Sequence, residues 1–429
     1  MKEVYTVRKY TGKKQIEVEV PGSKSITNRA LMLAALSDGK CTLNGVLFSD
    51  DSRAFLSCLI DLGFEVIIEE DKKRVTIYGL AGNIPNRNAE INVRSAGTAA
   101  RFLTTMLAFA GGNYTLNSSE QMKKRPMEPL LSILRQSGVS IHCLEEEGHF
   151  PFRLSSNGVT IEEIAIDTNI SSQFASSLLM AGILLPKGLR IQMLGNRVKG
   201  AYIRTTLSMM EQFGIKFTQD GSIYTVPNGC HYNVETYNIE PDVSGACYFY
   251  AMAPLLGASV LVKNVHYNSI QGDIKFLDVL EQLGCVTEDT EQGIRVSGVN
   301  NGIFNGITID MNNFSDQTMT LAVLAPFANS PTTIENISHI RHQETDRINA
   351  ILQELTKLGI QCEEVKEQKG IRIYPGIIHP ETIETYEDHR MAMAFTLIGL
   401  RVGGIKISNP NCCAKTFENY FKLIDKITE

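Results

Sequence analysis

The sequence predicts a two-domain α/β protein made of six repeated β-α-β-α-β-β units, three in each domain. Three observations carry this prediction. A helix end, a glycine and a strand recur five times, six helices of small and apolar residues recur with the same period, and proline stands at both places where we expect the chain to pass between domains. The 429 residues also suit two domains better than one, at roughly 100–200 residues per domain.

The first observation is a glycine that follows the end of a helix and precedes a strand. The five stretches read I-D-L-G-F-E-V, R-Q-S-G-V-S-I, E-Q-F-G-I-K-F, E-Q-L-G-C-V-T and T-K-L-G-I-Q-C, and their glycines are 70 to 76 residues apart. We expect each glycine at the C′ position of a helix, where the backbone needs a positive φ. The five glycines are Gly63, Gly138, Gly214, Gly284 and Gly359.

The second observation is a helix rich in Ala, Ser, Leu and Met in each unit. Nearly every residue of these helices is apolar or small, so we expect other structure to surround them. The six are predicted at residues 25–36, 97–110, 173–185, 245–256, 317–328 and 390–400. Ser25, Thr98 and Ser244 are the N-caps that we expect for three of them.

The third observation concerns the two ends of the chain. The last unit ends in a helix at residues 417–427 without closing strands, and residues 4–20 could supply these strands. One domain would then consist of residues 1–20 and 241–429, and residues 21–240 would form an inserted domain of units one to three. The crossings near 20–21 and 240–241 both carry proline, which suits a hinge.

Composition narrows the class of protein. Hydrophobic residues are 43%, charged residues are 21% and the net charge is −6, which argues against broad binding to nucleic acid or to an anionic membrane. No apolar run reaches the length of a membrane helix, and the first residues lack a signal-peptide pattern. The nine cysteines show no C-x-x-C spacing, so we expect neither a disulfide framework nor a zinc ribbon, and a cytoplasmic location.

Cations gather near the starts of the buried helices. A helix start already favours anions through its free N–H groups and its dipole, and a capping role does not require a cation. If the domains face each other with these starts inward, a cleft between them would bind two multiply charged anions, such as a small phosphorylated acid. The cations are Lys24, Arg29, Arg94, Arg101, Arg125, Arg347, Arg390 and Lys415.

Four carboxylates stand among these cations. For Asp346 and Asp388 we favour ion pairs with neighbouring arginines. Asp316 and Glu344 are better candidates for acid/base chemistry, because Asp316 opens a buried helix and Glu344 lies three residues before Arg347, on the same predicted helical face.

Eight ordered motifs along the chain resemble those of the enolpyruvyl transferase family. They are P-G-S-K-S-x-x-N-R-A at 21–30, A-G-T-A at 96–99, K-x-R-P at 123–126, S-S-Q-F at 171–174, Q-G-D at 271–273, E-T-D-R at 344–347, D-H-R-M-A-M at 388–393 and A-K-T-F at 414–417. The resemblance covers the whole chain. It implies an inside-out α/β barrel in two domains of three units each, which agrees with the repeats.

The resemblance also implies a reaction between shikimate 3-phosphate and phosphoenolpyruvate in the cleft between closing domains, with no metal and no organic cofactor. Asp316, helped by Lys24, would accept the proton of the attacking 5-hydroxyl. Glu344 would protonate the methylene carbon and later take that proton back. Elimination of phosphate from a tetrahedral intermediate would then leave an enol ether, on the chorismate branch of aromatic amino acid biosynthesis. We expect a monomer that binds neither nucleic acid nor a membrane.

The binding residues implied by the resemblance form two sets. Those for phosphoenolpyruvate are Lys24, Gly97, Arg125, Gln173, Arg347, Arg390 and Lys415. Those for shikimate 3-phosphate are Lys24, Ser25, Arg29, Ser171, Ser172, Gln173, Tyr202, Lys199, Asp316, His339 and Gln343. Ser25 and Arg29 would bind the shikimate carboxylate.

Four positions depart from the family pattern. Ser95 and Phe102 replace the usual Asn and Pro around A-G-T-A, which predicts changed sensitivity to glyphosate, a competitor of phosphoenolpyruvate. Gln343 replaces a lysine that would contact the shikimate phosphate, whereas Lys199 stands where a serine is common. We therefore hypothesise that Lys199 supplies the missing charge.

Other functions stay open at this point. A family member that acts on UDP-N-acetylglucosamine carries a cysteine in the loop before Arg125, and this chain has none at 118–126. Another phosphorylated hydroxy acid remains an alternative acceptor. An RNA 3′-phosphate cyclase-like protein fits the acidic net charge poorly, and a binding protein without catalysis fits the intact acid/base residues poorly.

Overall fold

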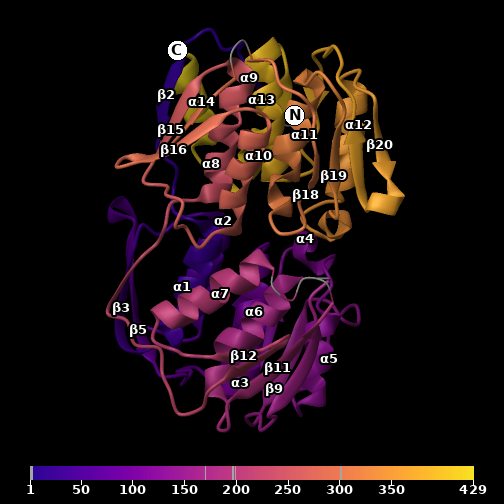
Figure 1. The fold of residues 1–429 in the computed structure, drawn as a ribbon. Coiled ribbons are helices and arrows are strands. Elements are labelled where there is room, and N and C mark those ends of the chain that lie inside the picture. The colour runs from indigo at the N-terminus through magenta and orange to yellow at the C-terminus, as the bar shows by residue number, and fades with distance from the viewer. Residues whose placement is uncertain (1–2, 170, 196–197, 199, 300–301) are drawn as a thin grey trace. The chain divides into compact units, whose positions relative to one another are not determined.

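The chain has a mixed α/β fold with two compact units, seen in a computed structural model that describes residues 3–169, 171–195, 198, 200–299 and 302–429. Unit 1 comprises Met1–Pro21 and Pro241–Glu429, and unit 2 comprises Gly22–Glu240 (Figure 1). Both termini therefore belong to unit 1. None of the described helices is long and apolar enough to span a membrane.

The described strands of unit 2 form three four-stranded sheets. One contains β14 (Thr236–Asn238), β3 (Asp38–Asn44), β5 (Arg74–Leu80) and β4 (Val66–Glu69). The second contains β6 (Asn88–Asn92), β7 (Gly112–Asn117), β9 (Phe152–Ser156) and β8 (Ser140–Cys143). The third contains β10 (Glu163–Asp167), β11 (Leu189–Leu194), β13 (Ile223–Val226) and β12 (Thr218–Asp220).

The described strands of unit 1 form two four-stranded sheets and one three-stranded sheet. The first contains β16 (Val286–Thr290), β17 (Gly293–Ser297), β15 (Ser259–Lys263) and β2 (Gln15–Val18). The second contains β18 (Thr308–Asp310), β19 (Thr332–Glu335), β21 (Gly370–Ile373) and β20 (Cys362–Val365). The third contains β1 (Val4–Thr6), β23 (Lys406–Ser408) and β22 (Thr382–Ile383).

Every described sheet includes one parallel pair of strands. In two sheets, the parallel partner is not the strand that precedes the intervening helix along the chain. β6 with β7, β10 with β11, β18 with β19 and β22 with β23 pair across one intervening helix. β2 instead pairs with β15, and β14 with β3. The chain leaves unit 1 just after β2 and leaves unit 2 just after β14, so each of these strands stays in the unit that the chain is leaving. Figure 1 shows the indigo β2 beside β15.

This exchange corrects part of the prediction for residues 4–20. β1 does pair with β23 and so joins the last sheet. β2 does not join that sheet, because its parallel partner is β15.

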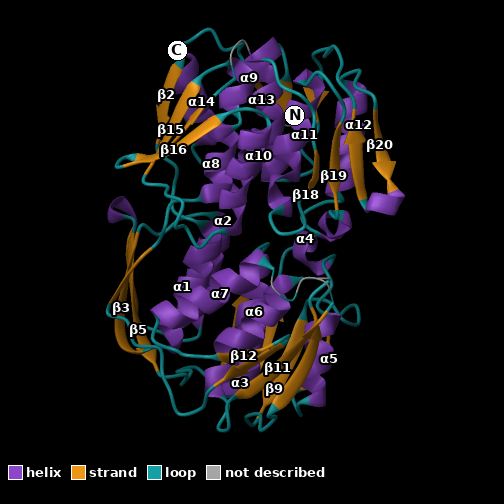
Figure 2. Cartoon of the chain, in the orientation of Figure 1, coloured by secondary structure: helices purple, strands orange, loops and turns teal. Residues whose placement is uncertain are grey.

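Each unit contains seven described α-helices. In unit 2 they are α1 (Lys24–Leu36), α2 (Asp50–Asp61), α3 (Gly97–Ala110), α4 (Glu120–Lys123), α5 (Glu128–Gln136), α6 (Ser172–Ala181) and α7 (Ala201–Gln212). In unit 1 they are α8 (Val243–Tyr250), α9 (Met252–Leu256), α10 (Phe276–Gln282), α11 (Thr318–Leu324), α12 (Arg347–Lys357), α13 (His389–Val402) and α14 (Tyr420–Thr428). Of these helices, α1, α3 and α13 are almost entirely buried. Figure 2 shows α1, α6 and α7 between the sheet of β3 and β5 and the sheet of β11 and β12.

The six helices of small and apolar residues exist and are buried, but three of them are shorter than predicted. The helix predicted at 173–185 ends at Ala181 and is followed by a 3₁₀ turn (Gly182–Leu184). Prolines interrupt two others. α3 has the predicted bounds, and α1 and α13 extend slightly beyond theirs. The helix predicted at 245–256 divides into α8 and α9, and the one at 317–328 becomes α11 followed by a 3₁₀ turn (Ala325–Phe327). Pro254 and Pro326 lack the N–H that would continue the helical hydrogen bonds.

Two other features were tested by the structure. The five glycines after helices all have φ between 86° and 93°, so the predicted C′ positions are confirmed. The three predicted N-caps are wrong. The caps are Ser23, Ala96 and Asp242, because these residues have extended backbones and the helices already begin at Lys24, Gly97 and Val243.

Candidate active site

The Pro-Gly turn before α1 is closely packed within unit 2. A Cβ on Gly22 would lie 2.0 Å from the carbonyl oxygen of Gly45, so only glycine fits there. The N–H of Ser23 donates to the carbonyl of Glu240 at 2.8 Å. This contact anchors the backbone just before α1. The Nζ of Lys24, the first residue of α1, lies 3.7 Å from a carboxylate oxygen of Asp51.

Arg29 of α1 is a buried cation, with only 1% of its surface exposed. Its guanidinium donates to Thr206 Oγ1 at 2.8 Å, to the carbonyls of Ser25 at 2.9 Å and Tyr202 at 3.2 Å, and to Ser176 Oγ at 3.4 Å. All four acceptors are neutral, and within the described parts of the chain Arg29 forms no ion pair. Burial lowers the pKa of Arg29 to about 10. A buried cation with neutral neighbours favours an incoming anion.

Two aromatic rings flank this guanidinium. The ring centroid of Phe102 lies 5.5 Å from Arg29 Cζ, and that of Tyr202 lies 5.7 Å away. Phe102 belongs to α3 and is fully buried. The residue that departs from the family pattern is therefore a direct neighbour of Arg29, a contact that the sequence alone did not predict.

Two further arginines converge on the start of α3. A Cβ on Gly97 would lie 2.7 Å from Arg125 Nη1 and 3.1 Å from Arg101 Nη1. Arg125 Nε is buried and has no hydrogen-bond partner among the described atoms. The free N–H groups of the helix start and these guanidinium groups together make a local positive site. Arg94, which we also expected at a functional junction, is exposed in a left-handed turn.

The two cationic groups of unit 2 are connected through α1. Asn28, beside Arg29, donates from Nδ2 to Thr98 Oγ1 in the first turn of α3 at 2.7 Å. Asn28 is fully buried, and its Oδ1 has no partner among the described residues. The contact holds the starts of α1 and α3 side by side.

Polar residues begin α6 as the sequence predicted. Ser171 is the N-cap, and its Oγ accepts the N–H of Gln173 at 3.2 Å. Ser172 is the first helical residue, and Gln173 Oε1 is buried without a described partner. Lys199 lies outside the described residues.

In unit 1, Arg347 is the centre of a buried ion-pair network. Its Nε lies 2.7 Å from Asp388, its Nη1 lies 3.0 Å from Asp316 and its Nη2 lies 2.9 Å from Glu344. Burial opposes the charge of Arg347, but the carboxylates of Asp388, Glu344 and Asp316 outweigh it and raise its pKa. The predicted ion pair of Asp388 is thus present, and both candidate acid/base residues contact the same arginine.

Two more predicted cations contact these carboxylates. Arg390 Nη2 lies 2.9 Å from Asp316, and Lys415 Nζ lies 3.6 Å from Glu344. Arg390 and Lys415 are 6% and 8% exposed, so both pairs are largely shielded from water. The structure therefore brings together, in one network, six residues that the sequence analysis singled out: Arg347, Arg390, Lys415, Asp316, Glu344 and Asp388.

The remaining predicted residues of unit 1 lie next to this network. The side chain of Gln343 accepts a short hydrogen bond from Arg347. His339 Nε2 lies 2.7 Å from Ser315 Oγ, one residue before Asp316.

Two local predictions for the carboxylates are wrong in detail. Glu344 precedes α12 instead of belonging to it, because Asp346 caps that helix by accepting the N–H of Asn349 at 3.1 Å. Asp316 lies in a 3₁₀ turn (Ser315–Gln317) ahead of α11. Asp346 also forms the ion pair that we predicted, with Arg341 at 2.7 Å.

Sequence reasoning assigned no role to Asp273, although the Q-G-D motif marks it. Its carboxylate is 6% exposed and accepts hydrogen bonds from Gln317 Nε2 at 3.0 Å and, by a shorter contact, from Ser244 Oγ. Its neighbour Gln271 donates from Nε2 to the carbonyl of Pro241 at 2.8 Å.

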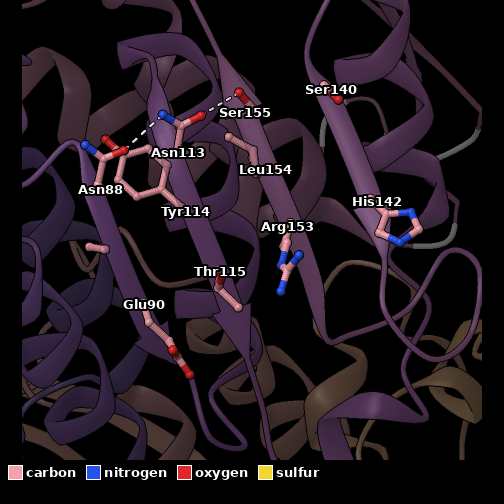
Figure 3. A pocket seen from close by; sticks show the side chains of 11 residues that line it. Asn88, Glu90, Asn113, Tyr114, Thr115, Ser140, His142, Arg153, Leu154 and Ser155 are labelled. Atoms are coloured by element: carbon pink, nitrogen blue, oxygen red, sulfur yellow. Dashed lines mark hydrogen bonds between the residues drawn. The ribbon is translucent and has the colours of Figure 1, made fainter.

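A surface pocket of about 420 Å³ lies elsewhere in unit 2, over the sheet of β6, β7, β9 and β8 (Figure 3). Two hydrogen bonds connect its side chains to one another, from Asn113 Nδ2 to Asn88 at 3.0 Å and from Ser155 Oγ to Asn113 at 2.6 Å. No residue predicted to bind or to catalyse lines it, so it is separate from the candidate site. Its lining residues are Asn88, Ala89, Glu90, Asn113, Tyr114, Thr115, Ser140, His142, Arg153, Leu154 and Ser155.

Comparisons with known proteins agree over almost the whole chain. A sequence model of the family described as EPSP synthase (3-phosphoshikimate 1-carboxyvinyltransferase) matches residues 10–424. A 3-phosphoshikimate 1-carboxyvinyltransferase of Nostoc punctiforme is 42% identical over 413 residues, covering 96% of each chain. A protein of Halalkalibacterium halodurans, named 3-phosphoshikimate 1-carboxyvinyltransferase 2, is 37% identical and covers 96% of this chain and 91% of that protein.

A solved structure has the same fold. The EPSP synthase of Acinetobacter baumannii superposes with a TM-score of 0.82 and covers 99% of this chain and 98% of its own, at 23% identity. Because the family model matches residues 10–424 and the Nostoc punctiforme relative is 42% identical over 96% of the chain, the chain described here belongs to the EPSP synthase family.

Proposed function

We propose that this protein transfers the enolpyruvyl group of phosphoenolpyruvate to the 5-hydroxyl of shikimate 3-phosphate and releases phosphate. The observation that carries the proposal is the network of unit 1, in which Asp316 and Glu344 are held by Arg347, Arg390 and Lys415. An addition followed by an elimination needs a proton acceptor and a proton donor beside fixed cations. Membership of the EPSP synthase family supports the same reaction.

The proposed steps balance protons and electron pairs. Asp316 accepts the proton of the 5-hydroxyl as its oxygen attacks C2 of phosphoenolpyruvate, and Glu344 protonates C3. In the second step phosphate leaves with the electron pair of its C–O bond and takes up the proton held by Asp316, while Glu344 takes a proton back from C3. Arg347 and Arg390 bind the carboxylate of phosphoenolpyruvate, for which the planar guanidinium is suited.

The residues of unit 2 bind the anionic groups of the substrates. Arg29, with Ser25, binds the carboxylate of shikimate 3-phosphate, which its burial among neutral acceptors supports. Arg125, at the start of α3, binds the phosphate of phosphoenolpyruvate, together with Lys24. Ser171, Ser172, Gln173 and Tyr202 contact the other substrate in this proposal.

A phosphate-release assay tests the function. The purified protein is incubated with phosphoenolpyruvate and shikimate 3-phosphate, and the product is identified by mass spectrometry. UDP-N-acetylglucosamine and unphosphorylated shikimate serve as alternative acceptors. We expect rapid release only with shikimate 3-phosphate, and release only with UDP-N-acetylglucosamine would refute the proposal.

We propose the six-unit, inside-out barrel with its two domains and proline hinges, which the parallel pair in every sheet supports. We also propose a location in the reducing cytoplasm, which the nine free cysteines support. That the protein is a monomer is a separate proposal. The role of Lys199 toward the shikimate phosphate rests on the sequence alone.

A further inference from the structure

The Q-G-D motif at residues 271–273 takes no part in the function proposed above. Its last residue, Asp273, lies in a 3₁₀ turn (Gly272–Lys275) of unit 1 and is 6% exposed. An ionisable carboxylate at such depth is costly unless other groups satisfy it. We therefore expect hydrogen bonds and nearby charges to offset the cost of burying Asp273.

Asp273 is joined by hydrogen bonds to the turn that carries Asp316. Gln317 Nε2 donates to Asp273 Oδ2 at 3.0 Å, and Gln317 Oε1 accepts from Thr320 Oγ1 at 2.9 Å. The second contact fixes the orientation of the Gln317 amide, so its NH₂ group points to Asp273. Gln317 directly follows Asp316, and the position of Asp316 thus depends on the Asp273–Gln317 contact.

Several charged and ionisable groups face Asp273. Asp316 and Arg390, which form an ion pair at 2.9 Å, act on it from the turn before α11 and from α13. From α8, Ser244 donates to the Asp273 carboxylate and Cys247 Sγ lies 3.6 Å from the Asp273 carbonyl oxygen. Asp242, the N-cap of α8, acts on the same Cys247.

These surroundings place the ionisation of Asp273 close to neutral pH. Burial and the charge of Asp316 raise the pKa of Asp273 to about 6, against the opposing effects of Arg390, Ser244 and Gln317. The interaction between the two carboxylates is mutual. An ionised Asp273 therefore increases the proton affinity of Asp316 and makes it a stronger base.

We propose that Asp273 is a positioning residue for Asp316, which it holds through Gln317. Its negative charge, when present, also favours proton uptake by Asp316. The proposal rests on the function proposed above, in which Asp316 accepts the proton of the 5-hydroxyl. Asp273 itself receives no proton from the substrate.

The test is the pH dependence of kcat/KM for product formation between pH 5 and 9. Wild type is compared with Asp273→Asn, with Ser244→Ala and with Asp278→Asn, a matched control at an exposed carboxylate that pairs with Lys275 at 3.3 Å. We expect wild type to lose activity on the acid side near pH 6. Asp273→Asn loses this decline and is roughly 10- to 100-fold slower at its plateau, because Asp316 loses the ionised carboxylate that increases its basicity.

The Ser244→Ala variant provides a second, gentler test. Without the hydrogen bond from Ser244, the Asp273 carboxylate is harder to ionise. The decline of kcat/KM on the acid side therefore moves to higher pH, by about half a unit or more. Asp278→Asn keeps the wild-type profile.

Two results would overturn the proposal while wild type still forms the product. One is an Asp273→Asn profile that is lower by the same factor at every pH, which means a purely structural role. The other, decisive if Asp273→Asn does not fold, is an unshifted acid limb in Ser244→Ala. Failure of wild type to form any product would instead refute the proposed function.

Discussion

Arg29 and Lys24 stand five residues apart on one helix, yet their surroundings differ. Arg29 is enclosed by neutral acceptors and two aromatic rings, whereas Lys24 lies 3.7 Å from Asp51. This difference supports separate tasks, substrate binding for Arg29 and chemistry for Lys24.

We therefore predict that Arg29→Ala weakens shikimate 3-phosphate binding by roughly 10- to 150-fold, the value of one or more charge-assisted hydrogen bonds. Lys24→Ala should reduce kcat more than Arg29→Ala does. Calorimetric titration and steady-state kinetics measure the two effects, with Arg29→Lys as a control that keeps the charge but loses the planar fork. Unchanged affinity together with lost turnover in Arg29→Ala would show that the two roles are wrongly divided.

Phe102 is one of the two residues that we expect to change the sensitivity to glyphosate, and its contacts indicate how. Its ring packs on Arg29 inside unit 2, and it shares α3 with Gly97, beside which Arg125 lies. Proline at this position would remove the ring and one helical N–H.

We predict that Phe102→Pro changes the inhibition constant of glyphosate by several-fold and lowers affinity for shikimate 3-phosphate. Inhibition measured against phosphoenolpyruvate tests the first effect. Phe102→Leu, which keeps α3 intact but removes the ring, separates the loss of the cation–π contact from the helix defect. An inhibition constant unchanged in Phe102→Pro would contradict the prediction.

At the scale of elements, the glycines that end the helices share one conformation but not one environment. Gly214 has φ +93° and a Cβ there would meet nothing within 4 Å. Gly359 has φ +86°, and a Cβ there would lie 2.6 Å from Cδ2 of His379.

We predict that Gly214→Ala destabilises the protein by about 1 kcal/mol, the cost of a side chain in the left-handed region. Gly359→Ala should cost more, because His379 must also move. Chemical denaturation measures both, and Gly214→Asn, which tolerates positive φ better, should recover part of the loss. An equal loss of stability at the two sites would mean that His379 moves aside without a measurable free-energy cost.

The sequence pattern locates the helices, but it does not reveal the pairing of β2 and β14 or the contact of Glu344 with Arg347. Period and composition located the six buried helices, because these depend on residues close together in the chain. The partners of β2 and β14 depend on where the chain passes between units, which no local pattern records. Glu344 likewise reaches Arg347 from outside α12, since a capping aspartate shifted the helix start.

For the whole molecule, the buried carboxylate of Asp273 links stability to pH. Its pKa is raised to about 6 by burial and by the charge of Asp316. The folded state thus binds this proton more tightly than the unfolded state, whose pKa is about 4. The stabilising contribution is complete below pH 4 and is lost as pH rises through about 6.

We predict that wild type loses on the order of 2 kcal/mol of unfolding free energy, relative to Asp273→Asn, as the pH rises from 4.5 to 7.5. Urea denaturation of both proteins at these two pH values measures the change. Asp278→Asn should show no such trend, and a stability difference between Asp273→Asn and wild type that does not vary with pH would argue against the raised pKa.

Local sequence patterns are enough to predict the mixed α/β class, the six buried helices, the glycine turns and the residue types of the candidate site. These follow from local propensity and periodicity, and from motifs whose residues are close in the chain. Tertiary structure alone decided that Arg29 meets Phe102, that Asp316 bridges Arg347 and Arg390, and that Asp273 supports Asp316 through Gln317. Such contacts join residues 31 to 74 positions apart, and only the packing of helix starts against one another selects them.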